Sequence, residues 1–318
     1  MENNGFQHVA VLVPCYNEAV TIAQVVGDFK RALPGASVHV YDNNSSDDTS
    51  AIARQSGALV RHVGLQGKGN VVRRMFADIE ADVYVMVDGD ATYDAQSAPV
   101  MVRRLLDEGL DMVVATRVSQ EEAAYRAGHR FGNRLLNGVV EVLFGSVFSD
   151  MLSGYRAFSR RYIKSFPAHS RGFEIETELT VHALEMRIPA AEVKTQYRAR
   201  PEGSFSKLST YSDGWRILCT IFLLLRTERP LAFFGYIGIL FLGFAAALAL
   251  PLFLTYVQTG LVPRLPTAIL VMGLLVLASL SFVAGLVLDT LTRSRQENKR
   301  MAYLAITGPS DELLHLRS

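Results

Sequence analysis

The sequence predicts an α/β protein with an open, mostly parallel sheet, followed by two helices that cross a membrane. Two observations carry this prediction. Up to residue 229, short apolar, β-branched segments alternate with segments of helical spacing, which is the order typical of a parallel sheet. Between Arg229 and Asp289, the only charged residue is Arg264. This change of composition places the boundary between a soluble part and a membrane part just before residue 230.

The alternating segments indicate where the strands and helices lie. Strands are expected at residues 8–14, 37–42, 58–62, 82–87 and 111–116, and helices at 19–33, 47–57, 69–80 and 95–108. In such sheets, ligands bind outside the carboxyl ends of the strands. The residues that follow each strand are therefore the first candidates for a functional site.

Composition excludes some classes of function. The chain has 318 residues and a formal net charge of +1 without a long basic run, so we expect no binding to nucleic acid. Its two cysteines, Cys15 and Cys219, form no CxxC or metal-ligand pattern, which agrees with a reducing compartment. Residues 1–8 are polar and lack an apolar core, so we expect no cleavable signal peptide.

Two apolar runs, 231–257 and 265–288, are each long enough to cross a hydrocarbon core as a helix. The short loop between them predicts a hairpin, and Pro251 would kink the first helix or mark its end. Lys and Arg flank the hairpin at Arg216, Arg226, Arg229, Arg293, Arg295, Lys299 and Arg300. The two runs predict a multi-pass membrane protein, and we expect the membrane to be a bacterial inner membrane. The positive-inside rule predicts its orientation. The soluble part and both termini would be cytoplasmic. The alternative is a buried helical hairpin in a soluble protein.

The segments beside the hairpin complete the predicted organisation. Residues 208–229 mix apolar and charged side chains, which predicts an amphipathic juxtamembrane helix on the membrane surface, with an ordinary core helix as the alternative. The expected division is a soluble domain at 1–207, this helix at 208–229, the transmembrane hairpin at 230–290 and a cytoplasmic tail at 291–318.

Polar groups follow four of the expected strands. They are 14–18 (PCYNE), 42–47 (DNNSSD), 88–90 (DGD) and Arg117. Any one of them could be a turn or a helix cap, but four at one edge of a sheet indicate a binding site. Lys68 lies between two glycines at the start of an expected helix. This segment either holds phosphate or forms a flexible turn.

Asp88 and Asp90 flank Gly89 at the end of a buried strand. Two carboxylates in such a place are costly unless a cation compensates them. Hard divalent cations bind carboxylate oxygens and bridge to substrate phosphates, where they neutralise charge on a departing diphosphate. We therefore predict that Asp88 and Asp90 bind Mg²⁺ or Mn²⁺.

Taken together, these motifs resemble the inverting family 2 glycosyltransferases with the GT-A fold. The resemblance rests on 11–18 (VLVPCYNE), the cluster that begins at Asp42 and the motif at 88–90. Two further segments, 150–156 (DMLSGYR) and 203–208 (GSFSKL), resemble the dolichyl-phosphate mannose synthase branch and its bacterial polyprenyl-phosphate relatives. The resemblance covers roughly residues 8–210 and extends to the membrane hairpin, which many bacterial relatives carry.

The resemblance implies a role for each matching residue. The nucleotide would contact Pro14, Tyr16, Glu18 and Asp42, and the donor diphosphate would contact Asp88, Gly89, Asp90, Arg117, Arg200 and Lys207. The acceptor phosphate would contact Arg117, Arg130 and Asn133, where the family often shows serine in place of Asn133. Asp90 would be the leading metal ligand. Thr92 stands where the family often has glutamine, which leaves the metal shell open.

The resemblance implies single transfer of a sugar from a UDP- or GDP-linked donor to a polyisoprenyl phosphate of the undecaprenyl or dolichyl type. An acceptor phosphate is already anionic near neutral pH and needs little help from a base, so Asp90 and Arg117 would carry the catalysis. Glu176, on an expected helix, would approach the sugar or cap the helix. A nucleotidyltransferase and a non-catalytic membrane scaffold or flipping subunit are the alternatives. A homo-oligomer is compatible with the sequence, which does not determine the oligomeric state.

Overall fold

The computed structural model describes residues 8–118, 148–168, 174–198, 222–262 and 264–308, together with 138, 141, 172, 200–201 and 219. The chain forms two compact units. The sheet unit consists of Met1–Trp215 and Lys299–Ser318, and the hairpin unit consists of Arg216–Asn298.

The sheet unit contains a seven-stranded sheet with the strand order β3-β2-β1-β4-β6-β5-β7. The strands are β1 (Val9–Cys15), β2 (Ser37–Asp42), β3 (Leu59–His62), β4 (Val83–Met86), β5 (Met112–Val118), β6 (Arg156–Ser159) and β7 (Ala190–Gln196). β6 runs antiparallel to both β4 and β5, and the other pairings are parallel. The prediction of a mostly parallel sheet is confirmed.

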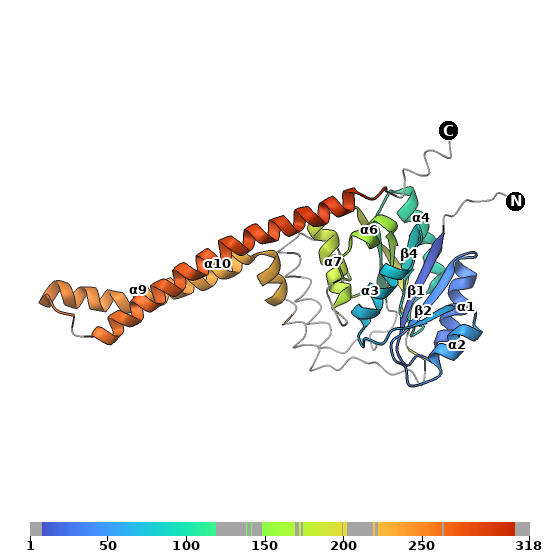
Figure 1. Ribbon diagram of the computed structural model, residues 1–318, viewed down its shortest axis with the longest axis horizontal. Coiled ribbons are helices and arrows are strands. Elements are labelled where there is room, and N and C mark those ends of the chain that lie inside the picture. Colours follow the sequence, from blue (N-terminus) through green and yellow to red (C-terminus); the bar gives the residue numbers. More distant parts are fainter. Residues whose placement is uncertain are drawn as a thin grey trace. The chain divides into compact units, whose positions relative to one another are not determined.

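Helices cover both faces of this sheet (Figure 1). They are α1 (Ile22–Ala32), α2 (Thr49–Gln55), α3 (Lys68–Asp78), the 3₁₀ turn η1 (Ala95–Ser97), α4 (Ala98–Asp107), α6 (Arg160–Ser165) and α7 (Ile175–Met186). The first five strands and the helices between them lie within a few residues of their predicted positions. β6 and β7 were not predicted, because β6 has four residues and begins with an arginine, and β7 carries Glu192 and Lys194.

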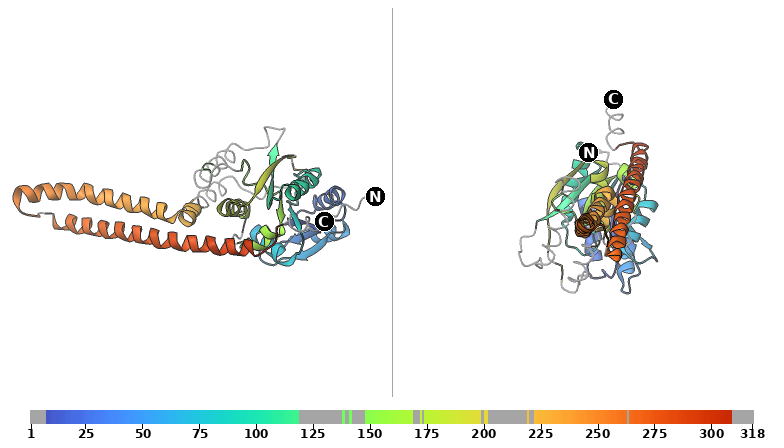
Figure 2. Two further views of the ribbon diagram at one scale, coloured as in Figure 1. Left: turned by 90° about the horizontal axis from the view of Figure 1, so that it is seen from above. Right: turned by 90° about the vertical axis from the view of Figure 1, so that its left-hand side faces the viewer.

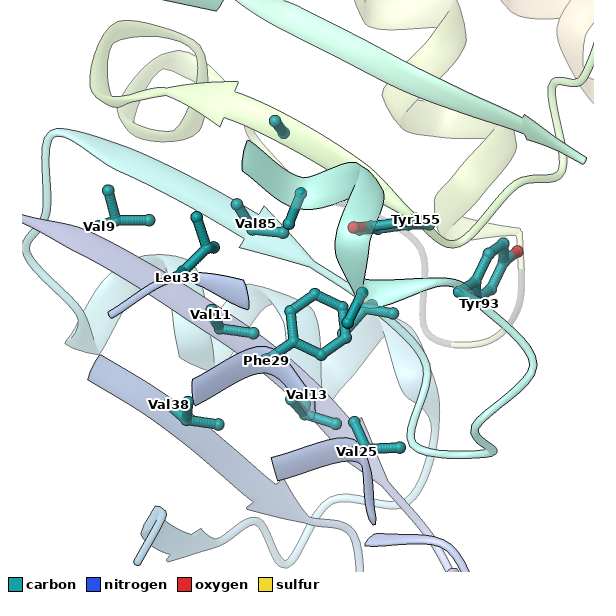
Figure 3. Close-up of a cluster of buried hydrophobic side chains, with 14 of the residues drawn as sticks. Val9, Val11, Val13, Val25, Phe29, Leu33, Val38, Val85, Tyr93 and Tyr155 are labelled. Carbon is teal, nitrogen blue, oxygen red and sulfur yellow. The ribbon is translucent and has the colours of Figure 1, made fainter. Parts of the chain in front are cut away.

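Alternation along the strands builds one core on each face. In β1, Val9, Val11 and Val13 join the cluster under α1 and α4, and Ala10 and Leu12 join the cluster under α3, α6 and α7. Figure 3 shows the first cluster, where the rings of Phe29 and Tyr155 meet edge to face at 5.8 Å. A fully buried valine, leucine or phenylalanine side chain contributes roughly 2 kcal/mol to the stability of the fold. The two cores therefore stabilise the sheet from both faces.

The register brings the predicted strand ends to one edge. Cys15, the last residue of β1, pairs with Asp42, the last residue of β2, and β4 runs parallel to β1 on its other side. β5 points the same way, since β6 is antiparallel to both β4 and β5. The loops after β1, β2 and β4 and the end of β5 therefore meet along the carboxyl edge of the sheet, as predicted.

The hairpin unit contains α9 (Pro230–Thr259), and most of α10 (Leu265–Leu304) also belongs to it. The two helices lie side by side in all three views (Figures 1 and 2). Glycines let them approach closely, since a Cβ atom at Gly238 would lie 2.9 Å from the ring of Phe282. Pro251 lies within α9, which continues to Thr259. α10 continues to Leu304, beyond the predicted end at residue 288, and an ion pair between Arg293 and Asp289 supports this extension.

Among the described residues, α9 and α10 are the two helices long and apolar enough to cross a membrane. Few residues of their apolar windows are buried, and large side chains such as Phe253 and Leu254 are exposed. This exposure disfavours the alternative of a buried hairpin in a soluble protein. Of the predicted juxtamembrane helix at 208–229, the structure describes 219 and 222–229, and 222–228 are helical. The rest of that segment lies outside the described residues.

Candidate active site

The motif Asp88-Gly89-Asp90 lies across the end of β1. A Cβ atom at Gly89 would lie 2.8 Å from the Sγ of Cys15, so the close approach requires glycine. The Thr21 hydroxyl donates to the carbonyl of Gly89 at 2.6 Å and lies 3.3 Å from a carboxylate oxygen of the buried Glu18. The loop after β4 and the loop after β1 are thus joined by hydrogen bonds as well as by packing.

Asp90 is buried, and its two carboxylate oxygens have different partners. Oδ1 accepts hydrogen bonds from the backbone N–H and the hydroxyl of Thr92, at 3.2 and 2.6 Å. Oδ2 lies 2.7 Å from Nη2 of Arg200. The Thr92 hydroxyl therefore orients Asp90.

Arg200 reaches Asp90 because two distant segments pair. Tyr93 and Tyr197 form an antiparallel bridge, and the backbone N–H of Arg198 donates to the carbonyl of Thr92 at 2.9 Å. This pairing carries the chain that follows β7 across the end of the Asp-Gly-Asp motif. The position predicted to close over the donor diphosphate therefore lies beside the predicted metal ligand.

Asp88 contacts a lysine instead of an arginine. The Nζ of Lys68 lies 2.5 Å from Oδ1 of Asp88, and it also forms an ion pair with Glu176. Lys68 is the first residue of α3, and Glu176 lies in the first turn of α7. The other side of Asp88 is closed by backbone, since a Cβ atom at Gly154 would lie 2.5 Å from Oδ2. One ammonium group therefore compensates two carboxylates from different elements.

Burial sets the charge states in this cluster. Burial lowers the pKa of Lys68, but the charges of Asp88 and Glu176 outweigh it, so the net shift is upward and the ammonium form is retained. Burial raises the pKa of Glu176, and the charge of Lys68 opposes that shift. Within the described part of the chain, Oε2 of Glu176 is buried and has no hydrogen-bond partner. An unsatisfied buried oxygen of this kind is costly, which makes Glu176 a candidate for contact with a ligand.

The loops after β1 and β2 form the other end of the site. Asp42 is buried and accepts hydrogen bonds from Ser45 N–H at 3.2 Å and Ser50 Oγ at 2.9 Å. Asn17 has a positive φ of 52° and accepts from Ser46 N–H at 2.8 Å. The two loops are therefore held together beside Glu18. Pro14 lies in β1, and the ring of Tyr16 is exposed at the same edge.

Asn43 has a structural role. Its side-chain amide donates to the carbonyl of Leu65 at 2.7 Å, and its oxygen accepts from Gly67 N–H at 2.6 Å. Gly67 has a φ of 122°, a conformation that favours glycine, and it caps α3. Asn43 thus fixes the start of α3 and, with it, the position of Lys68.

Arg117, at the end of β5, forms a bidentate ion pair with Asp150. Its Nε and Nη2 lie 2.7 and 2.8 Å from the two carboxylate oxygens, and the guanidinium lies 5.5 Å from the ring centre of Tyr197. Glu192 holds the other side of this loop by accepting from the backbone N–H of Ser149 at 2.6 Å. The predicted contact of Arg117 with phosphates remains a prediction, and Asp150 is the group that orients it here.

The structure thus brings most of the predicted site residues to one edge. Those it describes there are Pro14, Tyr16, Glu18, Asp42, Asp88, Gly89, Asp90, Arg117, Glu176 and Arg200. Arg130, Asn133 and Lys207 lie outside the described residues. The sequence did not predict Lys68 or Asp150 as site residues. The signals that point to them are the two glycines beside Lys68 and the position of Asp150 at the start of the segment 150–156.

The donor set at this edge fits a hard divalent cation. Carboxylate oxygens of Asp88 and Asp90 are the ligand type that Mg²⁺ and Mn²⁺ bind, and Arg200 contacts Oδ2 of Asp90. Among the described residues there is no group of three or more His, Cys, Asp or Glu side chains placed to hold a metal. The two carboxylates therefore fit such a cation by the type of ligand atom alone.

Comparisons with known proteins agree with this geometry. The model of the family described as Glycosyl transferase family 2 matches residues 10–166. Glycosyltransferase AglJ of Haloferax volcanii is 38% identical over 250 residues, which cover 78% of this chain and 81% of that protein. A dolichyl-phosphate hexose transferase of the same organism is 28% identical over 72% of this chain and 99% of its own length.

Two further proteins extend the comparison. The undecaprenyl-phosphate 4-deoxy-4-formamido-L-arabinose transferase of Edwardsiella ictaluri is 26% identical and covers 77% of this chain and 76% of its own. A crystal structure of glucosyl-3-phosphoglycerate synthase from Mycobacterium tuberculosis, in complex with Mn²⁺, UDP and glucosyl-3-phosphoglycerate, superposes with a TM-score of 0.55 at 25% identity. It covers 68% of this chain and 80% of that one.

Proposed function

The chain belongs to glycosyl transferase family 2, and we propose that it transfers one sugar from a nucleotide-sugar to a polyisoprenyl phosphate, with inversion at the anomeric carbon. The family resemblance and the GT-A fold expected from the sequence are confirmed, and the enzyme is a glycosyltransferase. The alternatives of a nucleotidyltransferase and of a non-catalytic scaffold are thereby excluded. The donor base, the sugar and the acceptor are part of the proposal.

One observation carries the proposal best: at the carboxyl edge, each aspartate of the 88–90 motif is paired with a basic side chain. Lys68 contacts Asp88, and Arg200 contacts Asp90. A bound diphosphate is negatively charged and its divalent cation is positively charged. The cation can therefore replace the basic side chains at the two aspartates, and the diphosphate can replace the aspartates at Lys68 and Arg200. The site is thereby suited to an anionic, cation-bound ligand.

A polyisoprenyl phosphate is the acceptor that the rest of the chain supports. Two relatives are named for transfer involving dolichyl phosphate and undecaprenyl phosphate. α9 and α10 would hold the enzyme in the bilayer, where such a lipid resides. The positive-inside rule favours a cytoplasmic sheet unit and cytoplasmic termini. A cysteine at Thr259 should then react with an impermeant thiol reagent in intact cells, and labelling at Ser318 instead would reverse this orientation.

The reaction is a displacement at the anomeric carbon. An oxygen of the acceptor phosphate forms the new bond to that carbon, and the bond to the donor diphosphate breaks, which releases the nucleoside diphosphate. The acceptor phosphate is mostly dianionic near neutral pH, so no side chain has to remove a proton from it. Lys68 and Arg200 would contact the diphosphate, Arg117 the acceptor phosphate, and Glu176 the sugar.

Asp88 and Asp90 would hold Mg²⁺ or Mn²⁺, which supplies positive charge to the departing diphosphate. Arg200 would then move from Asp90 to the diphosphate. Pro14, Tyr16, Glu18 and Asp42 would bind the nucleotide at the other end of the edge, because their loops are held together there.

A donor panel tests the proposal. The purified chain in detergent is incubated with polyisoprenyl phosphate, Mg²⁺ or Mn²⁺, and UDP- or GDP-linked sugars in turn. We expect one donor to give a sugar-phosphate lipid and free nucleoside diphosphate, and EDTA to stop the reaction. Transfer that continues in EDTA would exclude the metal, and the absence of a lipid product with every donor would exclude the acceptor.

A further inference from the structure

The residues that follow the hairpin unit return to the sheet unit. Lys299–Ser318 groups with the sheet unit by its contacts, and the structure describes this segment up to Gly308. We call Lys299–Gly308 the docked segment. Its contacts lie at Asp111, just before β5, and on α7 near its carboxyl end. Because Arg117 closes the other end of β5, the contact at Asp111 lies at the amino edge of the sheet, opposite the candidate active site.

Tyr303 is the centre of this contact. Its hydroxyl donates to Oδ2 of Asp111 at 2.5 Å, and the guanidinium of Arg161 lies 4.3 Å from its ring centre. Tyr303 also packs against the core cluster under α3, α6 and α7. A hydrogen bond to a buried charge and a cation–π contact are both stronger when water is excluded. Tyr303 therefore stabilises the contact between the docked segment and the rest of the sheet unit.

A second contact lies on α7. The Nζ of Lys299 is 2.7 Å from a carboxylate oxygen of Glu185. The side chain of Glu185 is only 1% exposed, although Glu185 lies near the carboxyl end of α7. Within the described residues, its second oxygen has no hydrogen-bond partner. A buried carboxylate without Lys299 would be costly, so α7 carries a site whose charge matches the docked segment.

Gly308 completes the contact. It is buried, and a Cβ atom there would lie 3.0 Å from Nη1 of Arg161. Arg161 therefore contacts the docked segment at both Tyr303 and Gly308. The three contacts follow one another along the segment, which indicates a surface formed to receive it and not a single chance contact.

We propose that the docked segment couples the sheet unit to the second apolar helix and is required for transfer to an acceptor in a membrane, but not for binding of the nucleotide. This inference rests on the proposed function. α10 is continuous from Leu265 to Leu304, so docking gives the sheet unit a second connection to the hairpin besides the chain that precedes Pro230. A unit that is joined to the membrane at two points of the chain has less freedom to lose when it meets a membrane-borne acceptor.

Tyr303→Ala is the sharpest variant, because it removes the contact without leaving a buried charge unpaired. Asp111 keeps Arg161 at 2.8 Å and the Ser159 hydroxyl at 2.5 Å, so the sheet unit should fold. Met301→Ala is the matched control, since Met301 lies in the same turns of α10 and is exposed. Glu185→Lys provides an independent break, and Lys299→Glu in the same chain should restore the ion pair.

The experiment uses the full chain in vesicles that contain polyisoprenyl phosphate. In Tyr303→Ala and Glu185→Lys we expect faster amide hydrogen exchange in 299–306 and transfer to the lipid reduced by about tenfold. Binding of UDP or GDP should be unchanged, and the Glu185→Lys/Lys299→Glu chain should recover both properties. Met301→Ala should behave as the wild type.

The outcomes separate the two proposals. Unchanged exchange in Tyr303→Ala would overturn the docking. Faster exchange with undiminished lipid transfer would overturn the coupling. If the wild type transfers no sugar to the lipid, the proposed acceptor fails and the coupling fails with it, while the exchange data still decide whether the segment docks.

Discussion

Two buried aspartates, one at each edge of the sheet, are both paired with arginine and differ in the groups that hold them. Asp90, at the carboxyl edge, contacts Thr92 and Arg200. Asp111, at the amino edge, contacts Arg161 through both oxygens, together with the hydroxyls of Ser159 and Tyr303.

The difference separates a structural ion pair from an exchangeable one. Asp111 is fully buried and has a partner on each oxygen, so its charge is compensated permanently. Arg200 reaches Asp90 from a segment that follows β7, and its side chain is 29% exposed. The side chain of Arg161 is 20% exposed, so the number of partners distinguishes the two pairs more than exposure does. Asp111 is held by Arg161 through both oxygens and by two hydroxyl groups, and breaking such a buried pair costs several kcal/mol. Arg200 contacts one oxygen of Asp90 and can move to a ligand at smaller cost. We therefore assign stability to the amino edge and chemistry to the carboxyl edge.

Asp90→Asn should have the largest effect, and on activity alone. Asparagine still accepts the hydrogen bonds from Thr92, and water can solvate Arg200, so stability should change by less than about 1 kcal/mol. Loss of the metal-binding charge should lower the rate of transfer by about a thousandfold, or about 4 kcal/mol in the transition state. Rate assays and thermal unfolding measure the two effects. The exposed Asp107→Asn is the control, and near wild-type turnover in Asp90→Asn would remove Asp90 from the mechanism.

Asp111→Asn should show the reverse pattern. The change leaves Arg161 without a charged partner at Asp111, so unfolding in denaturant should become easier by about 3 kcal/mol. Binding of UDP or GDP by the folded protein, measured by calorimetry, should stay at the wild-type value. Weaker nucleotide binding in Asp111→Asn would contradict the division of roles between the two edges.

His182, on the helix that Lys299 contacts, should make the stability of the protein depend on pH. Burial, and then the charge of Lys299, lowers the pKa of His182 to about 3 from its ordinary 6.5. The unfolded chain therefore takes up a proton first, so stability is complete above pH 6.5 and falls as pH drops from 6.5 towards 3. Between pH 7 and pH 5 the loss should be about 2 kcal/mol.

The variant His182→Leu should remove this part of the pH dependence, since it has no group to titrate. Denaturant unfolding at pH 7 and pH 5 measures it, with His62→Gln as a control because the side chain of His62 is mostly exposed. An equal loss of stability in the wild type and His182→Leu would show that His182 is not the group responsible.

Arg117→Lys should have the smallest effect. Lysine cannot reproduce the bidentate pair with Asp150 or a planar contact with phosphate. We expect transfer to the polyisoprenyl phosphate to fall by about tenfold, or about 1.4 kcal/mol, with a much smaller change in donor binding. Arg103→Lys, at an exposed position in α4, is the control. Wild-type transfer by Arg117→Lys would leave Arg117 with a structural role alone.

The sequence was sufficient where local pattern decides structure. Apolar β-branched runs located β1, β2, β4 and β5, and their ends located Asp42, Asp88, Asp90 and Arg117. Glu176, which the sequence placed on a helix near the sugar, forms an ion pair with Lys68. The family resemblance also came from these local motifs.

The partners of these residues could not be predicted in the same way. Lys68 meets Glu176 across 108 positions of sequence, and Tyr303 meets Asp111 across 192. Such pairs depend on which helices the sheet brings together, and no local pattern contains that information. β6 escaped prediction for a related reason, because Arg156 is buried there through hydrogen bonds to Ser153 and Thr180 that form only in the folded chain.

The most direct test of the central claim compares two acceptors that differ only in the phosphate. The purified chain, with Mg²⁺ or Mn²⁺ and the donor selected by the panel, is offered a polyisoprenyl phosphate or the corresponding polyisoprenol, and the lipid products are measured by mass spectrometry. We expect a sugar-phosphate lipid from the first acceptor and no glycosylated product from the second. Equal transfer to the alcohol, or no transfer to the phosphate, would contradict it.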